Sequence, residues 1–257
     1  MVSKETHGAA AVEKGLELFL ALAEGTEGTA LSAVAAKAGL PLSTAHRIAG
    51  AYLRRGLLAR TGHGYYAPGP RLAALARHSL TAPLIAVARQ PLRRLAQKLG
   101  ATAHLGILED NMVTYLVKEH GGGPEILTRE MNQLEGYGSA IGKMLLAHLP
   151  QDEREAYLAG GPFVPLTANT ITDPSTLRTA LQDIRIQDYA FDNAEVDEHL
   201  FCLAVPVRDK SGTVRAAISI SRHADAPASL TQLKPMRDCA TRIGRNMPPL
   251  SNELKSL

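Results

Sequence analysis

Hydroxyl and guanidinium side chains gather between residues 43 and 54 of this 257-residue chain. Ser43 and Thr44 stand at the start of an amphipathic helical pattern, and Arg47 and Arg54 follow on its polar face. Serine and threonine hydroxyls bind phosphate oxygens, whereas an arginine either pairs with a phosphate or reads the edge of a guanine. The chemistry that these residue types and spacings favour is therefore the recognition of DNA.

Two helices joined by a tight turn are needed to hold this polar face in place. Apolar residues recur at helical spacing before the turn, and Gly39 follows them as a glycine follows the C-terminus of many helices. Ser43 is the residue that we expect to cap the second helix. The apolar stripe of that helix consists of Ala45, Ile48, Ala49, Tyr52 and Leu53. This pattern predicts a helix-turn-helix whose second helix enters a major groove.

The distribution of charge separates this prediction from an ordinary helical hairpin with a solvated basic face. No Asp or Glu occurs from Gly28 to Leu108. The same span holds eleven cationic residues, namely Lys37, Arg47, Arg54, Arg55, Arg60, Arg71, Arg77, Arg89, Arg93, Arg94 and Lys98. From Glu109 onward there are 15 Lys and Arg against 20 Asp and Glu, so the net charge of +3 hides a basic N-terminal part. Such a region is expected to displace counterions from a phosphate backbone.

Short elements on either side complete a winged domain in this prediction. Ahead of the helix-turn-helix, a third helix is predicted from an apolar stripe of Val12, Leu16, Phe19, Leu20 and Ala23. After it, residues 57–60 and 65–67 are predicted to be two short strands around a glycine-rich turn, which we interpret as the wing. Arg60 and His63 would then lie near backbone phosphates. A mere connecting turn is the alternative.

Beyond Pro70 the chain changes from helical to strand-like patterning. Residues 71–80 are predicted to form a linker helix, and Thr81-Ala82-Pro83 separates it from a second helix over 84–99. Two β-hairpins are predicted, at 103–117 and 200–221, with helices over 139–149, 152–158, 173–186 and 230–247. These elements predict an α+β domain, in which helices pack against one antiparallel sheet that curls around a pocket.

Composition excludes several classes of protein. Two cysteines, Cys202 and Cys239, cannot form a disulfide framework, and this frequency suits a reducing cytoplasm. No apolar run approaches the length that spans a membrane, and the first residues lack the pattern of a signal peptide. The histidines and cysteines lack the spacing of a metal site, so we expect neither a metal nor a cofactor.

Four stretches of the chain together resemble the isocitrate-lyase-regulator (IclR) family of bacterial transcription factors. They are the helix-turn-helix and wing over 12–66, the segment 140–147 (AIGKMLLA), the segment 188–192 (DYAFD) leading to 202–207 (CLAVPV), and 217–221 (AISIS). The resemblance covers about residues 10–247 and depends on the order and spacing of these stretches. It implies an α+β protein with an N-terminal winged helix-turn-helix DNA-binding domain (10–70), a linker helix (71–82) and a C-terminal GAF-like antiparallel-sheet domain for effector binding and oligomerisation (83–250).

The resemblance also implies partners. Members of the family usually dimerise through the N-terminal domains, tetramerise through the C-terminal ones and bind palindromic double-stranded operators. We therefore expect a cytoplasmic homodimer or homotetramer that regulates transcription, as a repressor, without a membrane or a cofactor. The residues that we expect to contact DNA are Ser32, Ser43, Thr44, His46, Arg47, Arg54, Arg60 and His63.

In this family a small organic acid lies between the loop ahead of the helix that bears Gly-Lys and the strands of the second hairpin. Matching motifs place seven residues of this chain there, namely Ser139, Ala140, Ile141, Asp192, Cys202, Ser219 and Ser221. Backbone N–H groups at the start of a helix suit a carboxylate. Tyr137-Gly138 and His199 stand where the family often has His-Ala and glycine. An aromatic acid is our first expectation for the effector, and a short keto- or hydroxy-acid is the second.

An enzyme is the alternative class of protein. Cys202 with a nearby histidine, His199 or His104, could form the thiol–imidazole pair of a hydrolase. Against this alternative, the chain contains no nucleophile elbow, phosphate loop or dinucleotide fingerprint. Cys202 could also be a buried small apolar residue, and the acidic residues between 195 and 198 are expected to be solvated.

Overall fold

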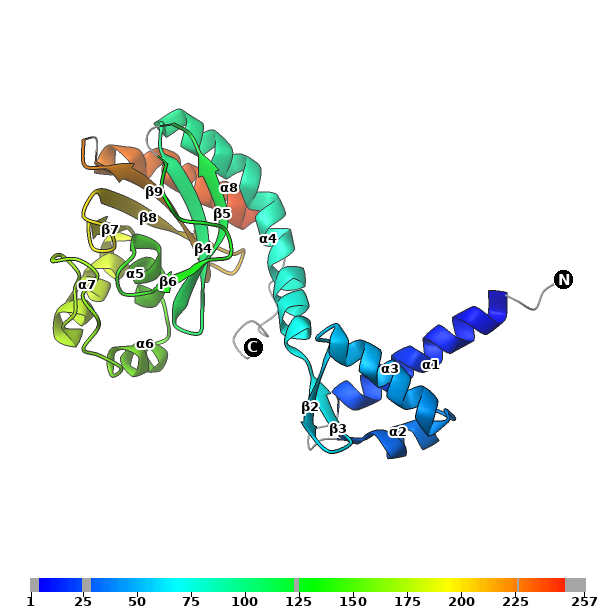
Figure 1. The fold of residues 1–257 in the computed structure, drawn as a ribbon. Coiled ribbons are helices and arrows are strands. Elements are labelled where there is room, and N and C mark those ends of the chain that lie inside the picture. Colours follow the sequence, from blue (N-terminus) through cyan, green and yellow to red (C-terminus); the bar gives the residue numbers. More distant parts are fainter. Residues whose placement is uncertain (1–4, 25–28, 123–124, 226, 248–257) are drawn as a thin grey trace. The chain divides into compact units, whose positions relative to one another are not determined.

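The computed structural model of the protein describes residues 5–24, 29–122, 125–225 and 227–247 (Figure 1). The chain divides into two compact units, Met1–Ser79 and Leu80–Leu257. Among these described residues, the first unit has one hydrophobic core and the second has two, one on each face of its sheet. None of the described helices has the length and apolar character that crossing a membrane requires.

The first unit is a winged helix-turn-helix, as predicted. Its elements are α1 (Glu5–Ala23), β1 (Thr29–Ala30), α2 (Leu31–Lys37), α3 (Leu42–Arg54), β2 (Leu58–Gly62) and β3 (Tyr65–Pro68). Strands β2 and β3 pair antiparallel and form the wing. The short strand β1, which the sequence pattern did not predict, pairs with β3 and gives the order β1-β3-β2.

In the turn between α2 and α3, the predicted glycine after α2 is confirmed and the predicted N-cap of α3 is not. Gly39 lies just past α2 with a φ of 60°, a conformation that glycine adopts without strain. The predicted N-cap of α3 is wrong, because Pro41 and not Ser43 precedes the helix, and no side chain caps it. Pro41 holds its backbone at φ −56° and ψ 138°, so the helix begins at Leu42. Ser43 therefore lies in the first turn, with its side chain exposed.

The buried face of α1 differs from the predicted stripe. Leu18 and Leu22 are fully buried, whereas Val12, Leu16 and Leu20 leave 72%, 53% and 44% of their surface exposed. The helix therefore carries two apolar stripes, of which the prediction chose mainly the outer one.

Tyr52 of α3 explains which face of α1 is buried. Its hydroxyl donates a hydrogen bond to the carbonyl oxygen of Gly15 at 2.9 Å, and its ring centroid lies 5.0 Å from that of Phe19. A Cβ atom at Gly15 would meet the tyrosine hydroxyl at 3.4 Å, so glycine leaves room for this approach. The side of α1 that carries Gly15 and Phe19 consequently packs against α3.

A single helix, α4 (Pro70–Leu99), occupies the region where we predicted two helices and a break at Thr81-Ala82-Pro83. Pro83 lacks the N–H that would bond to the carbonyl four residues earlier, which often kinks or ends a helix. Thr81, Leu84 and Ala88, however, are each no more than 1% exposed. Burial of this face offsets the lost hydrogen bond, so the helix continues and the predicted interruption is wrong.

The second unit is an α+β structure, as predicted, with helices on both faces of an antiparallel sheet (Figure 1). Its strands are β4 (Thr102–Glu109), β5 (Met112–His120), β6 (Gln133–Glu135), β7 (Ala190–Asn193), β8 (Leu200–Arg208) and β9 (Val214–His223), in the order β6-β5-β4-β9-β8-β7. Its further helices are α5 (Ala140–Ala147), α6 (Gln151–Leu158), α7 (Pro174–Gln187), a short 3-10 helix (Leu230–Gln232) and α8 (Leu233–Asn246). The predicted hairpins are β4–β5 and β8–β9, whereas the edge strands β6 and β7 were not predicted.

The alternation of side chains in β9 shows how the two faces of the sheet differ. Ile218 and Ile220 belong to the core beneath α4 and α8, whereas Ala217 belongs to the core beneath α5. Ser219 and Ser221 share the face of Ala217 because side chains alternate along a strand, and they are 3% and 4% exposed. Ser219 and Ser221 therefore lie on the face of the sheet that α5 covers.

Candidate DNA-binding surface and effector site

Helix α3 presents five of the residues that we expect to contact DNA, namely Ser43, Thr44, His46, Arg47 and Arg54. All of them are exposed except Thr44, which is half-buried. Ala45 and Ala49 on the opposite side of the helix are fully buried. Ser32, the expected contact from α2, is also exposed. The helix is thus anchored by small apolar residues and leaves its polar face open.

The wing carries the two remaining residues. The Arg60 guanidinium carbon lies 5.9 Å from the centre of the Tyr66 ring, and His63 is exposed at the turn between β2 and β3. Within the described part of the chain, no carboxylate lies at ion-pair distance from Arg47, Arg54 or Arg60. These cations therefore remain available for phosphate or base contacts.

One cavity in the second unit is lined by all seven residues that we expect to bind the effector, namely Ser139, Ala140, Ile141, Asp192, Cys202, Ser219 and Ser221. The other residues that line it, which we did not predict, are His104, Tyr115, Thr128, Leu134, Val196 and Leu200. The volume of the cavity is about 30 Å³. A small organic acid is larger than this, so its binding requires the lining side chains to move apart.

The start of α5 provides hydrogen-bond donors to the cavity. Ser139 is the N-cap of the helix, and its Oγ accepts a hydrogen bond from the backbone N–H of Gly142 at 3.0 Å. The N–H groups of Ala140 and Ile141 belong to the first turn, where a helix offers no acceptor of its own. Free donors and the partial positive charge of the helix terminus together suit a carboxylate.

Strands β8 and β9 bring a thiol and two hydroxyls to the opposite wall. Cys202 is paired in register with Ser221, and its thiol donates to the Ser221 Oγ at 3.1 Å. Ser219 is paired in register with His104 of β4. Three neighbouring strands thus place small polar groups on one face of the sheet, where a polar ligand could bind them.

Asp192 of β7 both lines the cavity and holds a turn. It is 2% exposed, and its Oδ1 accepts a hydrogen bond from the backbone N–H of Glu195 at 2.8 Å. Desolvation raises the pKa of Asp192 to about 6; the charge of Glu195 acts in the same direction, and that of Lys143 opposes it. Its carboxyl group therefore changes charge not far below neutral pH.

His104 lies in the cavity wall, although sequence reasoning considered it only as a partner for a catalytic thiol. It is 1% exposed, its Nε2 lies 2.7 Å from the Oγ1 of Thr128, and its Nδ1 has no hydrogen-bond partner among the described residues. Burial lowers the pKa of His104 to about 3, with a contribution from Lys118, so the ring is neutral. The strand period, which aims His104 at the same face as Ser219, was the signal that could have identified it.

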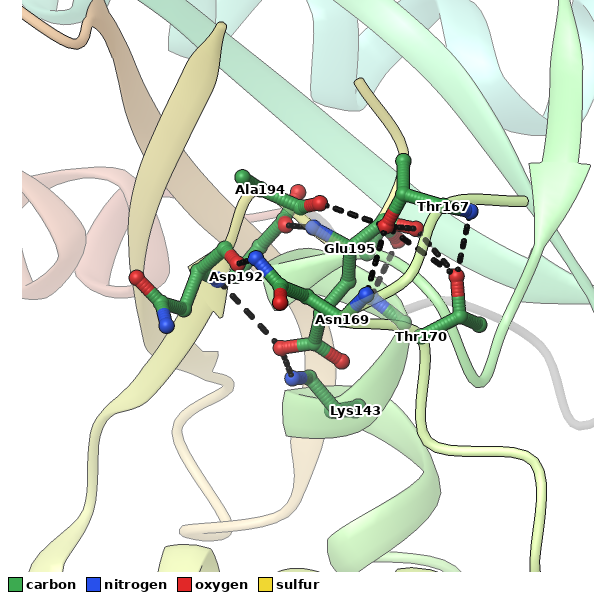
Figure 2. Close-up of polar contacts among 10 residues, drawn as sticks. Lys143, Thr167, Asn169, Thr170, Asp192, Ala194 and Glu195 are labelled. Carbon is green, nitrogen blue, oxygen red and sulfur yellow. Dashed lines mark hydrogen bonds and ion pairs between the residues drawn. The ribbon is translucent and has the colours of Figure 1, made fainter. Parts of the chain in front are cut away.

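A buried ion pair supports the turn that follows Asp192 (Figure 2). Lys143 of α5 and Glu195 are 3% and 4% exposed, and the Lys143 Nζ donates to the Glu195 Oε1. From the loop before α7, the Thr170 hydroxyl donates to the carbonyl oxygen of Glu195 at 2.6 Å, and the Thr167 hydroxyl donates to that of Ala194 at 2.7 Å. The turn is therefore held from a helix on one side and from a loop on the other.

The prediction that the acidic residues between 195 and 198 are solvated is wrong for Glu195. Asp197 and Glu198 are exposed, as predicted. Lys143 explains the difference, because it is the one charged residue of an otherwise apolar helix that is buried throughout. A buried ammonium group requires a carboxylate partner. A lysine within AIGKMLLA was the signal that a buried acidic partner had to exist elsewhere in the chain.

The pKa values of Cys202 and His104 are shifted in the directions that disfavour a catalytic thiolate–imidazolium pair. Burial raises the pKa of the Cys202 thiol well above its ordinary value, so the thiol keeps its proton at neutral pH. Burial also lowers the pKa of His104, which disfavours the imidazolium ion that stabilises a catalytic thiolate. His199, the other candidate partner, is exposed.

Across the described ranges, the structure contains no cluster of three or more side chains that could hold a metal ion.

Comparison with known families gives one match for each unit. The family described as IclR helix-turn-helix domain matches residues 11–62. The family described as Bacterial transcriptional regulator IclR C-terminal matches residues 77–245. Both are families of transcriptional regulators, so the comparison supports a regulator and not an enzyme.

Individual relatives agree with the family matches. The chain is 32% identical over 184 residues to the transcriptional regulator RhmR of Escherichia coli K12, and the match covers 71% of each chain. It is 28% identical over 213 residues to the transcriptional repressor IclR of the same organism, which covers 81% of this chain and 78% of the repressor. A solved structure of an IclR homolog from Microbacterium hydrocarbonoxydans, complexed with 4-hydroxybenzoate, matches with a TM-score of 0.64 and 30% identity, over 93% of this chain and 98% of the homolog.

Proposed function

The chain belongs to the IclR family of bacterial transcriptional regulators, and we propose that it is a cytoplasmic repressor whose operator affinity changes when a small organic acid binds its second unit. The observation that carries this proposal is the composition of the cavity. Residues from the start of α5 and from β7, β8 and β9, far apart in the sequence, line one cavity. Free backbone donors at one end and buried hydroxyls on the sheet offer complementary contacts to an organic acid.

For DNA, we propose that α3 enters the major groove with His46 and Arg47 toward the bases, while the phosphate backbone is contacted by Ser32, Ser43, Thr44, Arg54, Arg60 and His63. The exposure of this face and the absence of acidic residues from the surrounding sequence support the assignment. Replacement of a base-reading arginine relaxes sequence specificity, whereas replacement of a phosphate-contacting arginine weakens binding to all sequences.

For the effector, we propose that the acid's carboxylate binds the N–H groups of Ala140 and Ile141, with Asp192, Cys202 and the two serines of β9 around the rest of the molecule. An aromatic acid is the first candidate, and the 4-hydroxybenzoate complex of the Microbacterium hydrocarbonoxydans homolog supports this choice. A short keto- or hydroxy-acid such as pyruvate or lactate is the second candidate.

Isothermal titration calorimetry of the full chain tests these two classes. We expect 4-hydroxybenzoate to bind and Ser219→Ala to weaken that binding. If neither 4-hydroxybenzoate, pyruvate nor lactate binds, both effector classes are wrong.

We further propose that the protein dimerises through its first units. The outer stripe of α1, which consists of Val12, Leu16 and Leu20, is exposed and apolar and could pack against the same stripe of a second copy. Paired recognition helices match a palindromic operator. Light scattering of the Leu16→Glu variant should show a smaller assembly than light scattering of the unmodified chain.

In this proposal, helix α4 passes the effector signal to the DNA-binding unit. It begins at Pro70, directly after the wing, and ends at Leu99 within the second unit. Operator half-sites are spaced by the repeat of the duplex, so a small change in the spacing of two recognition helices changes affinity.

A further inference from the structure

A short segment beside the cavity connects it to helix α4. This segment, residues 125–132, is called the strap below, and it runs along β5. The Lys118 ammonium group donates hydrogen bonds to the carbonyl oxygens of Ile126 and Thr128. The backbone N–H of Met131 donates to the carbonyl oxygen of Tyr115 at 2.7 Å. The strap is therefore held by β5 at several points and has a defined conformation.

One residue of the strap belongs to the cavity. Thr128 lines it, and its hydroxyl lies 2.7 Å from the Nε2 of His104. The other ring nitrogen of His104 is buried and has no partner among the described residues. A neutral imidazole carries one proton, so a ligand that bonds to Nδ1 selects which nitrogen holds it. That choice decides whether Nε2 donates to Thr128 or accepts from it, so a bound ligand can change the hydrogen bond that joins His104 to the strap.

Two residues further along, the strap binds α4. The Glu130 carboxylate accepts two hydrogen bonds from Arg89 of α4, at 2.8 and 3.0 Å, and a third from the backbone N–H of Lys118 at 3.0 Å. Arg89 also reaches the Oε1 of Glu119 at 3.2 Å. A two-pronged arginine–carboxylate contact fixes direction as well as distance.

Glu119, the other carboxylate that Arg89 contacts, is held in place by a second arginine. Glu119 is 7% exposed, and Arg93, one turn further along α4, donates to its Oε2 at 2.8 Å. The Glu119 contacts therefore tie α4 to the sheet, whereas the Glu130 contact ties the same helix to the strap. Of the two contacts, only the one to Glu130 involves the strap, and Glu130 is also bonded to the Lys118 N–H of β5.

We propose that the Glu130–Arg89 pair is the contact through which occupancy of the cavity acts on α4, so that Glu130 and Arg89 are positioning residues for the effector response. The inference rests on the proposed function, because it assumes that the cavity binds the effector. Thr128 and Glu130 are separated by one residue, so a shift of Thr128 changes the position of the carboxylate. Arg89 and the helix that bears it then adjust to this change.

A merely structural role for the pair predicts a different outcome. The side chains of Arg89 and Glu130 are each 37% exposed, and exposed ion pairs contribute little to stability. Removal of the pair should therefore leave folding nearly unchanged. A loss of effector response without a loss of stability is the signature that distinguishes coupling from support.

The main test uses the full chain and the Glu130→Gln variant, with 4-hydroxybenzoate and pyruvate as probes. Operator affinity is measured by fluorescence polarisation with and without each probe. In the unmodified chain we expect a probe to change the affinity at least about fivefold. In the variant, the ratio of operator affinities measured with and without the probe should fall toward one. Probe binding, measured by calorimetry, and operator affinity without the probe should stay within about twofold of the values for the unmodified chain. A variant that keeps the full ratio overturns the proposal.

Glu155→Gln is the matched control. It breaks the Arg178–Glu155 pair between α6 and α7, whose side chains are 40% and 41% exposed and whose closest contact is also 2.8 Å. This variant should keep the response to the probe. If Glu155→Gln and Glu130→Gln lose the response equally, the effect is a general consequence of lost ion pairs, and the proposed route is wrong.

A second experiment requires no ligand. It tests the coupling between Thr128 and Glu130 even if neither probe is the effector. Thr128→Val removes the hydroxyl that contacts His104, and amide hydrogen exchange is followed in α4 from residue 85 to 95. We expect Thr128→Val to accelerate this exchange in the unmodified background and to have no further effect in the Glu130→Gln background. Independent, additive effects overturn the coupling even if both probes fail to bind.

Discussion

The DNA-facing surface and the effector cavity use the same kinds of side chains in opposite environments. On α3 and the wing, Arg47, Arg54 and Arg60 are exposed, and among the described residues they have no carboxylate partner. In the second unit the polar groups around Asp192 and Lys143 are buried and already bonded to one another. The polar groups of the DNA-facing surface therefore have no ion-pair partner in the free protein. The polar groups around the cavity are already hydrogen-bonded or ion-paired when no ligand is bound.

This difference determines what a substitution should change. An exposed arginine that has no ion-pair partner in the free protein can be removed with little loss of stability, so its replacement should affect mainly DNA binding. A group that is buried and paired leaves a partner unsatisfied when it is removed, so its replacement should affect folding as well as binding. The comparison fails if replacements on α3 unfold the protein or if replacements around the cavity leave stability unchanged.

The largest expected effect is at the buried ion pair. Lys143→Met leaves the Glu195 carboxylate buried without its partner, which should lower the free energy of unfolding by about 3–5 kcal/mol. Urea denaturation followed by circular dichroism measures it. The control is Lys234→Met, which breaks a pair whose side chains are 86% and 68% exposed; its midpoint should stay close to that of the unmodified chain. Equal midpoints for the two variants would contradict the account.

The same substitution at two helical glycines should give opposite results. A Cβ atom at Gly142 of α5 would lie 2.1 Å from the carbonyl oxygen of Gly136, so Gly142→Ala should destabilise the protein by about 3 kcal/mol. A Cβ atom at Gly50 of α3 meets nothing closer than the Arg54 Nη1 at 3.5 Å, so Gly50→Ala should stabilise by up to about 1 kcal/mol. Thermal unfolding of both variants is the measurement, and a stabilised Gly142→Ala would show that α5 is not packed as described.

On the DNA-facing surface we expect effects on binding without effects on folding. Arg47→Ala should weaken specific operator binding by about 1–3 kcal/mol if Arg47 contacts a base edge, with an unchanged unfolding midpoint. Electrophoretic mobility shifts with operator and with random duplex measure the two affinities. Unchanged operator affinity would mean that the recognition face is misplaced.

The wing should show a smaller and less specific effect. Arg60→Ala should weaken binding to operator and to random duplex alike, and it should reduce the dependence of log affinity on log salt by about 1. A salt titration of both duplexes is the measurement. A loss confined to the operator would assign Arg60 to base recognition instead.

The pKa of Asp192, raised to about 6, should make ligand binding in the cavity depend on pH. Below about pH 6 the Asp192 carboxyl is neutral and tolerates an acidic ligand; above it, a carboxylate faces the ligand's negative charge and disfavours binding. Affinity for a bound organic acid should therefore fall, by at most about tenfold per pH unit, as the pH rises above about 6. The neighbouring charges of Lys143 and Glu195 form an ion pair and offset one another. Calorimetry from pH 5 to pH 8 should show this fall, and Asp192→Asn should remove it.

Much of the fold could be predicted because its signals are local. The helix-turn-helix depends on apolar residues a few positions apart, and Gly39 ends α2 as expected. The start of α7 is equally local, since Asp173 caps it and Pro174 follows. The turn of the hairpin β4–β5 is formed by Asp110 and Asn111, both of which adopt positive φ, as these residue types tolerate. Such features can be predicted from the hydrophobic periodicity of the sequence and from the conformational preferences of single residues.

The errors arose where a local signal competes with packing. The predicted break near Pro83 ignores the burial of the same helix on the sheet, and the predicted stripe of α1 ignores the approach of Tyr52 to Gly15. The Lys143–Glu195 pair joins residues 52 positions apart, so no local pattern reports it. Motif resemblance named seven residues that line the cavity, but the unmatched lining residues, such as His104 and Thr128, depend on strand register and on an irregular segment.

We propose that an organic acid bound in the second unit changes the affinity of the first unit for DNA. The measurement that decides this is binding of the purified protein to the intergenic DNA beside its own gene, across a salt series, with and without 4-hydroxybenzoate or pyruvate. We expect specific, salt-sensitive binding that one of these acids changes at least about fivefold. Equal binding to that DNA and to random duplex at every salt concentration, or specific binding that neither acid alters, would show that the proposed function is wrong.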